Sequence, residues 1–236
     1  MESEIFFANG MVKRFGELIT QAESRTIEGM IDGRLETEPS ATDRFLARIE
    51  DTFSGGNNQQ GIVFRARSLR DRGRNAPERE FGADFCGVLN VRVAGFSQTK
   101  GFLTQGKSEK EGIKVRKEPY GLTTVRFTQN KELDRLREQA SRMLSVTPES
   151  FVIVYSTRGF VVVPAASVMG LKAGGELYAK AVDRFFKEYL MCFIGDPKLK
   201  AYDDATLDGL RAETDARTAI LFEVEQTVDR FKVEFS

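Results

Sequence analysis

Two stretches decide the fold: Glu78-Arg-Glu-Phe-Gly-Ala-Asp84 and Lys100-Gly-Phe-Leu-Thr-Gln105-Gly-Lys107. An apolar run from Phe85 to Val93 follows the first stretch, and residues 95–98 have the composition of a turn. This order predicts a β-hairpin in which residues 102–107 form the returning strand.

The hairpin would bring three kinds of polar group together. With a turn near residue 96, Asp84 lies opposite the strand end that carries Gln105 and Lys107. Because side chains alternate along a strand, Gln105 and Lys107 share one face and Gly106 has the other. Hard cations such as Mg²⁺ prefer carboxylate and carbonyl oxygens. A lysine beside such a cation can orient or deprotonate a water, or stabilise charge on a phosphate.

This arrangement resembles the PD-(D/E)xK restriction-endonuclease-like superfamily, in the branch that uses Gln-x-Lys. The resemblance covers roughly residues 36–170. Of four Asp/Glu/Gln-x-Lys matches in the chain, only Gln105–Lys107 lies inside a strand pattern and follows an aspartate that opens the preceding strand. The chain departs from the family twice, because Ala83 stands where proline often precedes the aspartate and Gln105 replaces a carboxylate. The second departure removes one negative charge from the expected metal site.

The resemblance implies an α/β fold, with a restriction-endonuclease-like core of a mixed central sheet flanked by helices. We expect a helical segment over residues 1–35, the nuclease core over 36–170 and a mainly helical C-terminal extension over 171–236, packed as one compact unit. Apolar periodicity predicts helices over 130–144, 174–194 and 203–214, and strands over 151–155 and 160–163. Periodicity does not decide whether residues 219–224 and 231–235 are strands or a short helix plus a strand.

The resemblance also implies a Mg²⁺ or Mn²⁺ site. Asp84 and Gln105 are its expected ligands, and Lys107 is the expected catalytic lysine. Glu38, four residues before Thr42-Asp43, is the candidate glutamate of the first core helix, and Glu36 is the fallback. The alternative for Glu38 is an acid at a helix N-terminus, favoured there by the helix dipole. Glu78 is a further candidate ligand.

Basic residues crowd the chain next to this site. Arg70, Arg72 and Arg74 follow a predicted strand, and arginines at this density suggest contacts with DNA phosphates. Lys110 lies in a charged segment, residues 108–119, expected as an exposed loop that could track a DNA backbone. The alternative for both groups is a solvated charged surface.

Composition narrows the chemistry. The 236 residues contain no histidine, which excludes Ser-His-Asp catalysis, Cys-His catalysis and histidine-ligated zinc. Lysines plus arginines number 35 and aspartates plus glutamates number 35, so the net charge is zero. Any basic surface that binds DNA must therefore be a local patch. There are only two cysteines and they have no metal-type spacing, which favours free thiols in a reducing compartment. No signal peptide and no apolar run of about 20 residues is visible, so we expect a cytoplasmic protein without a membrane partner.

The expected function is metal-dependent hydrolysis of DNA phosphodiester bonds by an endonuclease, in restriction or anti-phage defence. Expected partners are DNA and either a second copy of the chain or another protein of a defence system. The alternative is a catalytically weak or inactive nuclease fold that binds DNA or acts as a scaffold in a defence, repair or mobile-element complex.

Overall fold

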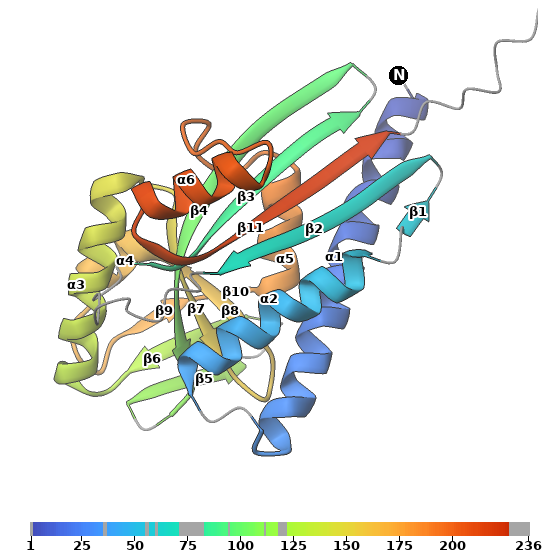
Figure 1. The fold of residues 1–236 in the computed structure, drawn as a ribbon. Helices are drawn as coiled ribbons and strands as arrows, with labels where there is room; N and C mark the ends of the chain where they lie inside the picture. The colour runs from blue at the N-terminus through green and yellow to red at the C-terminus, as the bar shows by residue number, and fades with distance from the viewer. Residues whose placement is uncertain are drawn as a thin grey trace, which may run out of the picture.

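The protein folds around a strongly twisted sheet with helices on both faces (Figure 1). The computed structural model describes residues 2–34, 37–54, 57–59, 61–70, 83–93, 95–110, 112–117 and 122–226. This is the mixed α/β class, with a mixed central sheet flanked by helices, that the sequence predicts.

The main sheet has eight strands in the order β1-β2-β11-β3-β4-β7-β8-β10. Their bounds are Asn57–Gln59 (β1), Ile62–Arg70 (β2), Ala83–Val93 (β3), Phe96–Ser108 (β4), Ser150–Tyr155 (β7), Val161–Pro164 (β8), Lys180–Ala181 (β10) and Ala216–Gln226 (β11). The β3–β4 hairpin predicted from the sequence is confirmed, with Phe85 opposite Thr104 and Val93 opposite Phe96. The predicted β7 and β8 are also confirmed as an antiparallel pair.

A second, three-stranded sheet has the order β5-β6-β9. It consists of Ile113–Lys117 (β5), Thr123–Phe127 (β6) and Glu176–Tyr178 (β9). The expectation that residues 108–119 form an exposed loop is therefore wrong, because β5 alternates buried Ile113 and Val115 with exposed neighbours. Residues 108–119 contain seven charged residues and only two apolar ones, Ile113 and Val115, and this pattern is too weak to predict a strand. The strand forms because it pairs with β6.

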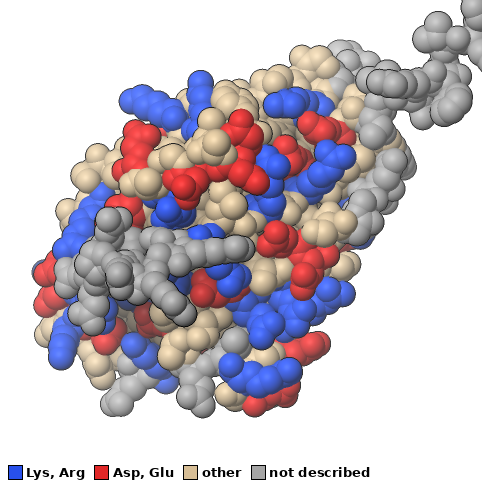
Figure 2. Space-filling view, in the orientation of Figure 1, with Lys and Arg blue, Asp and Glu red and all other residues tan. Residues whose placement is uncertain are grey.

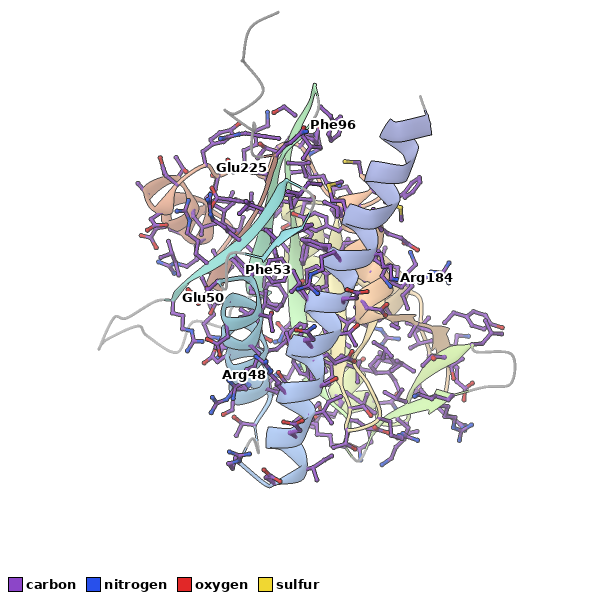
Figure 3. The ribbon with its side chains drawn as sticks, turned by 90° about the vertical axis from the view of Figure 1, so that its right-hand side faces the viewer. Arg48, Glu50, Phe53, Phe96, Arg184 and Glu225 are labelled. Carbon is purple, nitrogen blue, oxygen red and sulfur yellow. The ribbon has the colours of Figure 1, made fainter. Side chains whose placement is uncertain are left out.

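One face of the main sheet is covered by three helices, α1 (Glu2–Ile31), α2 (Glu38–Ser54) and α5 (Val182–Leu190). In Figure 3, α1 runs along this face, Glu50 and Phe53 mark α2, and Arg184 marks α5. Aromatic rings fill the layer between helices and sheet, and Phe15 packs edge-on against Phe53 with ring centres 5.4 Å apart. Burial of such rings supplies much of the apolar area that holds α1 and α2 in place.

The other face is covered by α3 (Asn130–Val146), α4 (Ala165–Met169) and α6 (Asp204–Glu213), together with the small sheet. The predicted α3 and α6 are confirmed within a few residues. The helix expected over 174–194 is shorter, because β9 and β10 occupy residues 176–181 before α5 begins at Val182.

The C-terminal part corrects the expected domain plan. Residues 171–236 contain α5 and α6, but β11 from the same segment lies at the centre of the main sheet, parallel to β3 and antiparallel to β2. Its buried run from Ala219 to Phe222 suits a strand covered on both faces. The C-terminal segment is therefore part of the core rather than a helical extension.

Candidate active site

The candidate site lies where β3 begins and β4 ends. Thr104 pairs with Phe85, so Gln105 stands beside Asp84 in the next step of the antiparallel ladder. Asp84 Oδ2 accepts hydrogen bonds from Gln105 Nε2 at 2.6 Å and from the backbone N–H of Gly106 at 2.7 Å. The hairpin thus brings together the aspartate and glutamine that the sequence singles out.

Glu38 reaches the same strand end from the first turn of α2. Its Oε2 atom lies 3.4 Å from Lys107 Nζ, and its Oε1 atom lies 3.4 Å from the backbone nitrogen of Ser108 and 3.2 Å from Lys110 Nζ. Lys107 is only 3% exposed, so its ammonium is held almost out of solvent against Glu38. The structure therefore brings Glu38, Asp84, Gln105 and Lys107 to one end of the sheet.

Burial dominates the electrostatics of Asp84. Desolvation raises the pKa of its carboxyl, while Arg217, the Gly106 N–H and Lys107 oppose the rise and Glu38 adds to it. Burial also acts to raise the pKa of Glu38, but Lys107, Lys110 and the Ser108 N–H more than offset it, so that this pKa is lowered. A cation between the two carboxylates would favour the ionised form of both.

The donors at this site fit a hard cation. Gln105 Oε1 is buried and accepts no hydrogen bond from any described residue, although a buried carbonyl normally has a partner. Asp84 and Glu38 add carboxylate oxygens of the kind that Mg²⁺ and Mn²⁺ prefer. Within the described ranges there is no group of three or more His, Cys, Asp or Glu side chains that could hold a metal ion. In the candidate site two donors would be carboxylates, of Asp84 and Glu38, and the third would be the amide oxygen of Gln105.

Gly106 allows the close approach around Asp84. A Cβ atom at this position would lie 2.7 Å from Thr42 Oγ1, 2.8 Å from the Tyr155 ring and 3.0 Å from Asp84 Oδ2. Tyr155 donates a hydrogen bond to Thr42 Oγ1 at 3.0 Å, and Thr42 in turn donates to the Glu38 carbonyl at 3.2 Å. The glycine therefore lets α2 pack close to the strand that carries Gln105 and Lys107.

Arg217 is a site residue that the sequence did not reveal. The ladder pairs Ala216 with Ala83 and Thr218 with Phe85, which places Arg217 level with Asp84. Its Nη2 atom lies 3.2 Å from Asp43 Oδ1 and donates to the Pro39 carbonyl at 3.3 Å. No local pattern around residue 217 indicates this role, because it depends on where β11 enters the sheet.

Of the predicted DNA-binding residues, the structure describes Arg70 and Lys110 but not the other two. Arg70 is exposed and donates to the Asp43 carbonyl at 2.9 Å, close to Arg217, and Lys110 lies between Glu38 and Glu132. Glu36, Glu78, Arg72 and Arg74 lie outside the described residues. Lysines, arginines and acids are interspersed over the face shown in Figure 2, so any phosphate contact must be local.

A second Gln-x-Lys on β4 has a different environment. Lys100 is buried and donates to the carbonyls of Tyr189 and Ile194, and its ammonium lies 4.8 Å from the centre of the Tyr189 ring. It therefore fastens the segment after α5 to the sheet. The two matches on one strand are distinguished by their surroundings, since Gln105 and Lys107 contact the partly buried carboxylates of Asp84 and Glu38, whereas Lys100 donates to backbone carbonyls.

No family model matches the chain, and neither a curated protein nor a solved structure matches it. In the part of the chain that the structure describes, no helix is both long and apolar enough to span a membrane.

Proposed function

We propose that the protein is a Mg²⁺- or Mn²⁺-dependent nuclease that hydrolyses phosphodiester bonds of DNA. The observation that carries the proposal is the convergence of Asp84, Gln105, Glu38 and Lys107 from a hairpin and a helix N-terminus. Restriction or anti-phage defence in the cytoplasm is the role we propose for this chemistry.

Each side chain has a distinct task in this proposal. Asp84 and Glu38 supply the negative charge that holds the cation. Gln105 Oε1, which accepts no hydrogen bond from the part of the chain that the structure describes, adds a neutral ligand. Gln105 Nε2 and the Gly106 N–H fix the orientation of the Asp84 carboxylate. The bound ion would polarise a phosphoryl oxygen and favour a nucleophilic hydroxide.

Lys107 would act on the phosphate itself. Its ammonium is nearly buried and its direction is set by Glu38, so it needs little reorganisation when negative charge builds on the phosphoryl oxygens. A preorganised cation of this kind contributes more in a water-poor site than on an exposed surface.

Cleavage of supercoiled plasmid tests the proposal. Wild-type protein should nick or linearise the plasmid with Mg²⁺ or Mn²⁺ and not with EDTA. Asp84→Asn and Lys107→Ala should each abolish cleavage in folded protein, whereas Lys198→Ala, at an exposed position after α5, should have no effect. Full activity of either site variant would refute the assignment.

A second candidate is a nuclease fold that binds DNA without cutting it. One observation favours it: Gln105 is a neutral residue that donates to Asp84, so only one carboxylate of the hairpin offers charge to a cation. A gel-shift titration that shows tight DNA binding in EDTA, together with no cleavage under any divalent cation, would support this alternative.

The arginines after β2 can be tested separately. Joint replacement of Arg70, Arg72 and Arg74 by Ala should weaken DNA binding across sequences. The log–log salt slope should fall by roughly one unit for each lost phosphate contact. An unchanged slope would mean that these arginines do not contact phosphates.

A further inference from the structure

Two lysines bind the same carboxylate in the candidate site. Lys107 Nζ lies 3.4 Å from Glu38 Oε2, and Lys110 Nζ lies 3.2 Å from Glu38 Oε1. Each oxygen of Glu38 is therefore opposite an ammonium group. A cation that uses Glu38 as a ligand must compete with at least one of these lysines.

The two lysines differ in how easily their side chains can move away from Glu38. The Lys107 side chain is 3% exposed, whereas the Lys110 side chain is 46% exposed. Lys110 also has a second acid within reach, because Glu132 Oε2 in the first turn of α3 lies 3.6 Å from its Nζ atom. The Lys110 backbone is held by the hydrogen bond from the Ile113 N–H to its carbonyl, so the side chain can move while the chain stays in place.

We propose that Lys110 competes with the divalent cation for Glu38 and leaves it for a backbone phosphate when DNA binds. This inference rests on the metal and DNA binding of the proposed function, not on cleavage, and deepens it. In the DNA-free protein the Lys110 ammonium neutralises Glu38 Oε1. In the complex it neutralises a phosphate, and Glu38 is free to serve as a metal ligand. DNA and metal therefore strengthen each other's binding.

The proposal requires reciprocal coupling. If DNA raises the affinity for the cation by some factor, the cation raises the affinity for DNA by the same factor. Coupling of this kind is typically fivefold to 150-fold, and displacement of one partly exposed lysine should give about tenfold. The protein would then hold its metal firmly only where substrate is present.

The first arm of the test uses Mn²⁺ without DNA. Free Mn²⁺ is measured by electron paramagnetic resonance during titration of wild type, Lys110→Met, Lys110→Arg and Lys114→Met. Lys110→Met should bind Mn²⁺ about tenfold more tightly than wild type. Lys110→Arg keeps the charge at Glu38 and should resemble wild type, and Lys114→Met removes an exposed lysine from β5 and should also resemble it. Equal Mn²⁺ affinity of wild type and Lys110→Met would overturn the proposal.

The second arm measures DNA binding by fluorescence anisotropy of a labelled duplex, in EDTA and in Ca²⁺, which uses the same oxygen ligands as Mg²⁺. Wild type should bind the duplex about tenfold more tightly with Ca²⁺. Lys110→Met should keep only the smaller part of that difference that comes from direct contact between the ion and a phosphate, and Lys114→Met should keep all of it. A Ca²⁺ effect of equal size in Lys110→Met and wild type would refute the exchange. Because neither arm requires cleavage, coupling without plasmid nicking would remove the nuclease function and leave this inference standing.

Discussion

Arg217 on β11 lies level with Asp84 on β3, although the two residues come from distant parts of the chain. The same arginine contacts Asp43 and the Pro39 carbonyl on α2. It therefore links β11, the sheet neighbour of the strand that carries Asp84, to the helix that carries Glu38. Its positive charge also opposes the rise in the pKa of Asp84.

Replacement of Arg217 by Met should loosen that link. We expect about 1 kcal/mol of lost stability, since the ion pair with Asp43 is partly exposed. Cleavage and Mn²⁺ affinity should both fall, because α2 no longer holds Glu38 in place, and Arg217→Lys should restore part of each. Chemical denaturation and Mn²⁺ titration measure these effects.

Arg65→Met is the matched control for this variant. Like Arg217, Arg65 on β2 forms an ion pair, in this case with Glu225 of β11, but it lies away from Asp84 along the sheet. Its loss should leave both cleavage and Mn²⁺ affinity unchanged. If Arg217→Met behaves in the same way, Arg217 has no part in the site.

The raised pKa of Asp84 predicts that ionisation of this carboxyl lowers the stability of the folded protein. Burial raises this pKa in the folded protein above its unfolded value, so the folded state binds the proton more tightly. The stabilising contribution is complete below the unfolded pKa and is lost as the pH rises through the folded pKa. At neutral pH without metal, the ionised carboxylate therefore costs stability.

Asp84→Asn should remove that cost. Its melting temperature should exceed that of wild type at pH 7 in EDTA. The difference should shrink as the pH falls from the raised folded-state pKa toward the ordinary range for aspartate, and this contribution should be gone below that range. Mn²⁺ should stabilise wild type and have little effect on Asp84→Asn. Scanning calorimetry across pH tests this, and a variant that is less stable than wild type at pH 7 would contradict it.

The sequence predicted that the hairpin brings Asp84 and Gln105 side by side. The hairpin follows from one apolar run, one turn and one returning strand, which fix the register of Asp84 against Gln105 within a few residues. Glu38 follows from the family resemblance, which expects a glutamate shortly before Thr42-Asp43, and the helix start at this point is a local signal. Arg217 could not be predicted, since the insertion of β11 between β2 and β3 is decided by long-range packing that leaves no local pattern.

Gly106→Ala should show how closely α2 must approach the hairpin. The added methyl group would lie within 3.0 Å of Thr42 Oγ1, the Tyr155 ring and Asp84 Oδ2, so neighbouring groups must shift. We expect a loss of about 1–3 kcal/mol and a larger relative loss of cleavage, because Asp84 itself is displaced. Gly170→Ala is the control, since a Cβ there meets nothing within 4 Å. Equal stability and activity of both variants would show that the packing is less tight than described.

The Gln105 amide offers the sharpest test of the proposed metal site. Gln105→Glu replaces the donor to Asp84 with a second carboxylate, so the variant should be less stable in EDTA and gain more from Mn²⁺ than wild type does. Cleavage should persist at a roughly tenfold lower Mn²⁺ concentration, because an anionic oxygen attracts the ion more strongly than an amide. Gln105→Leu has a similar size and no donor oxygen, so it should lose cleavage or require far more Mn²⁺.

Gln98→Leu provides the control for both Gln105 variants. Gln98 belongs to the other Gln-x-Lys of β4 and lies opposite Val91, away from Asp84. Its removal should leave the dependence of cleavage on Mn²⁺ as in wild type. Titration of Mn²⁺ against cleavage rate and melting temperature compares all four proteins. If Gln105→Leu follows the wild-type curve as closely as Gln98→Leu does, Gln105 does not bind the metal, and the unpaired Oε1 atom must have another cause.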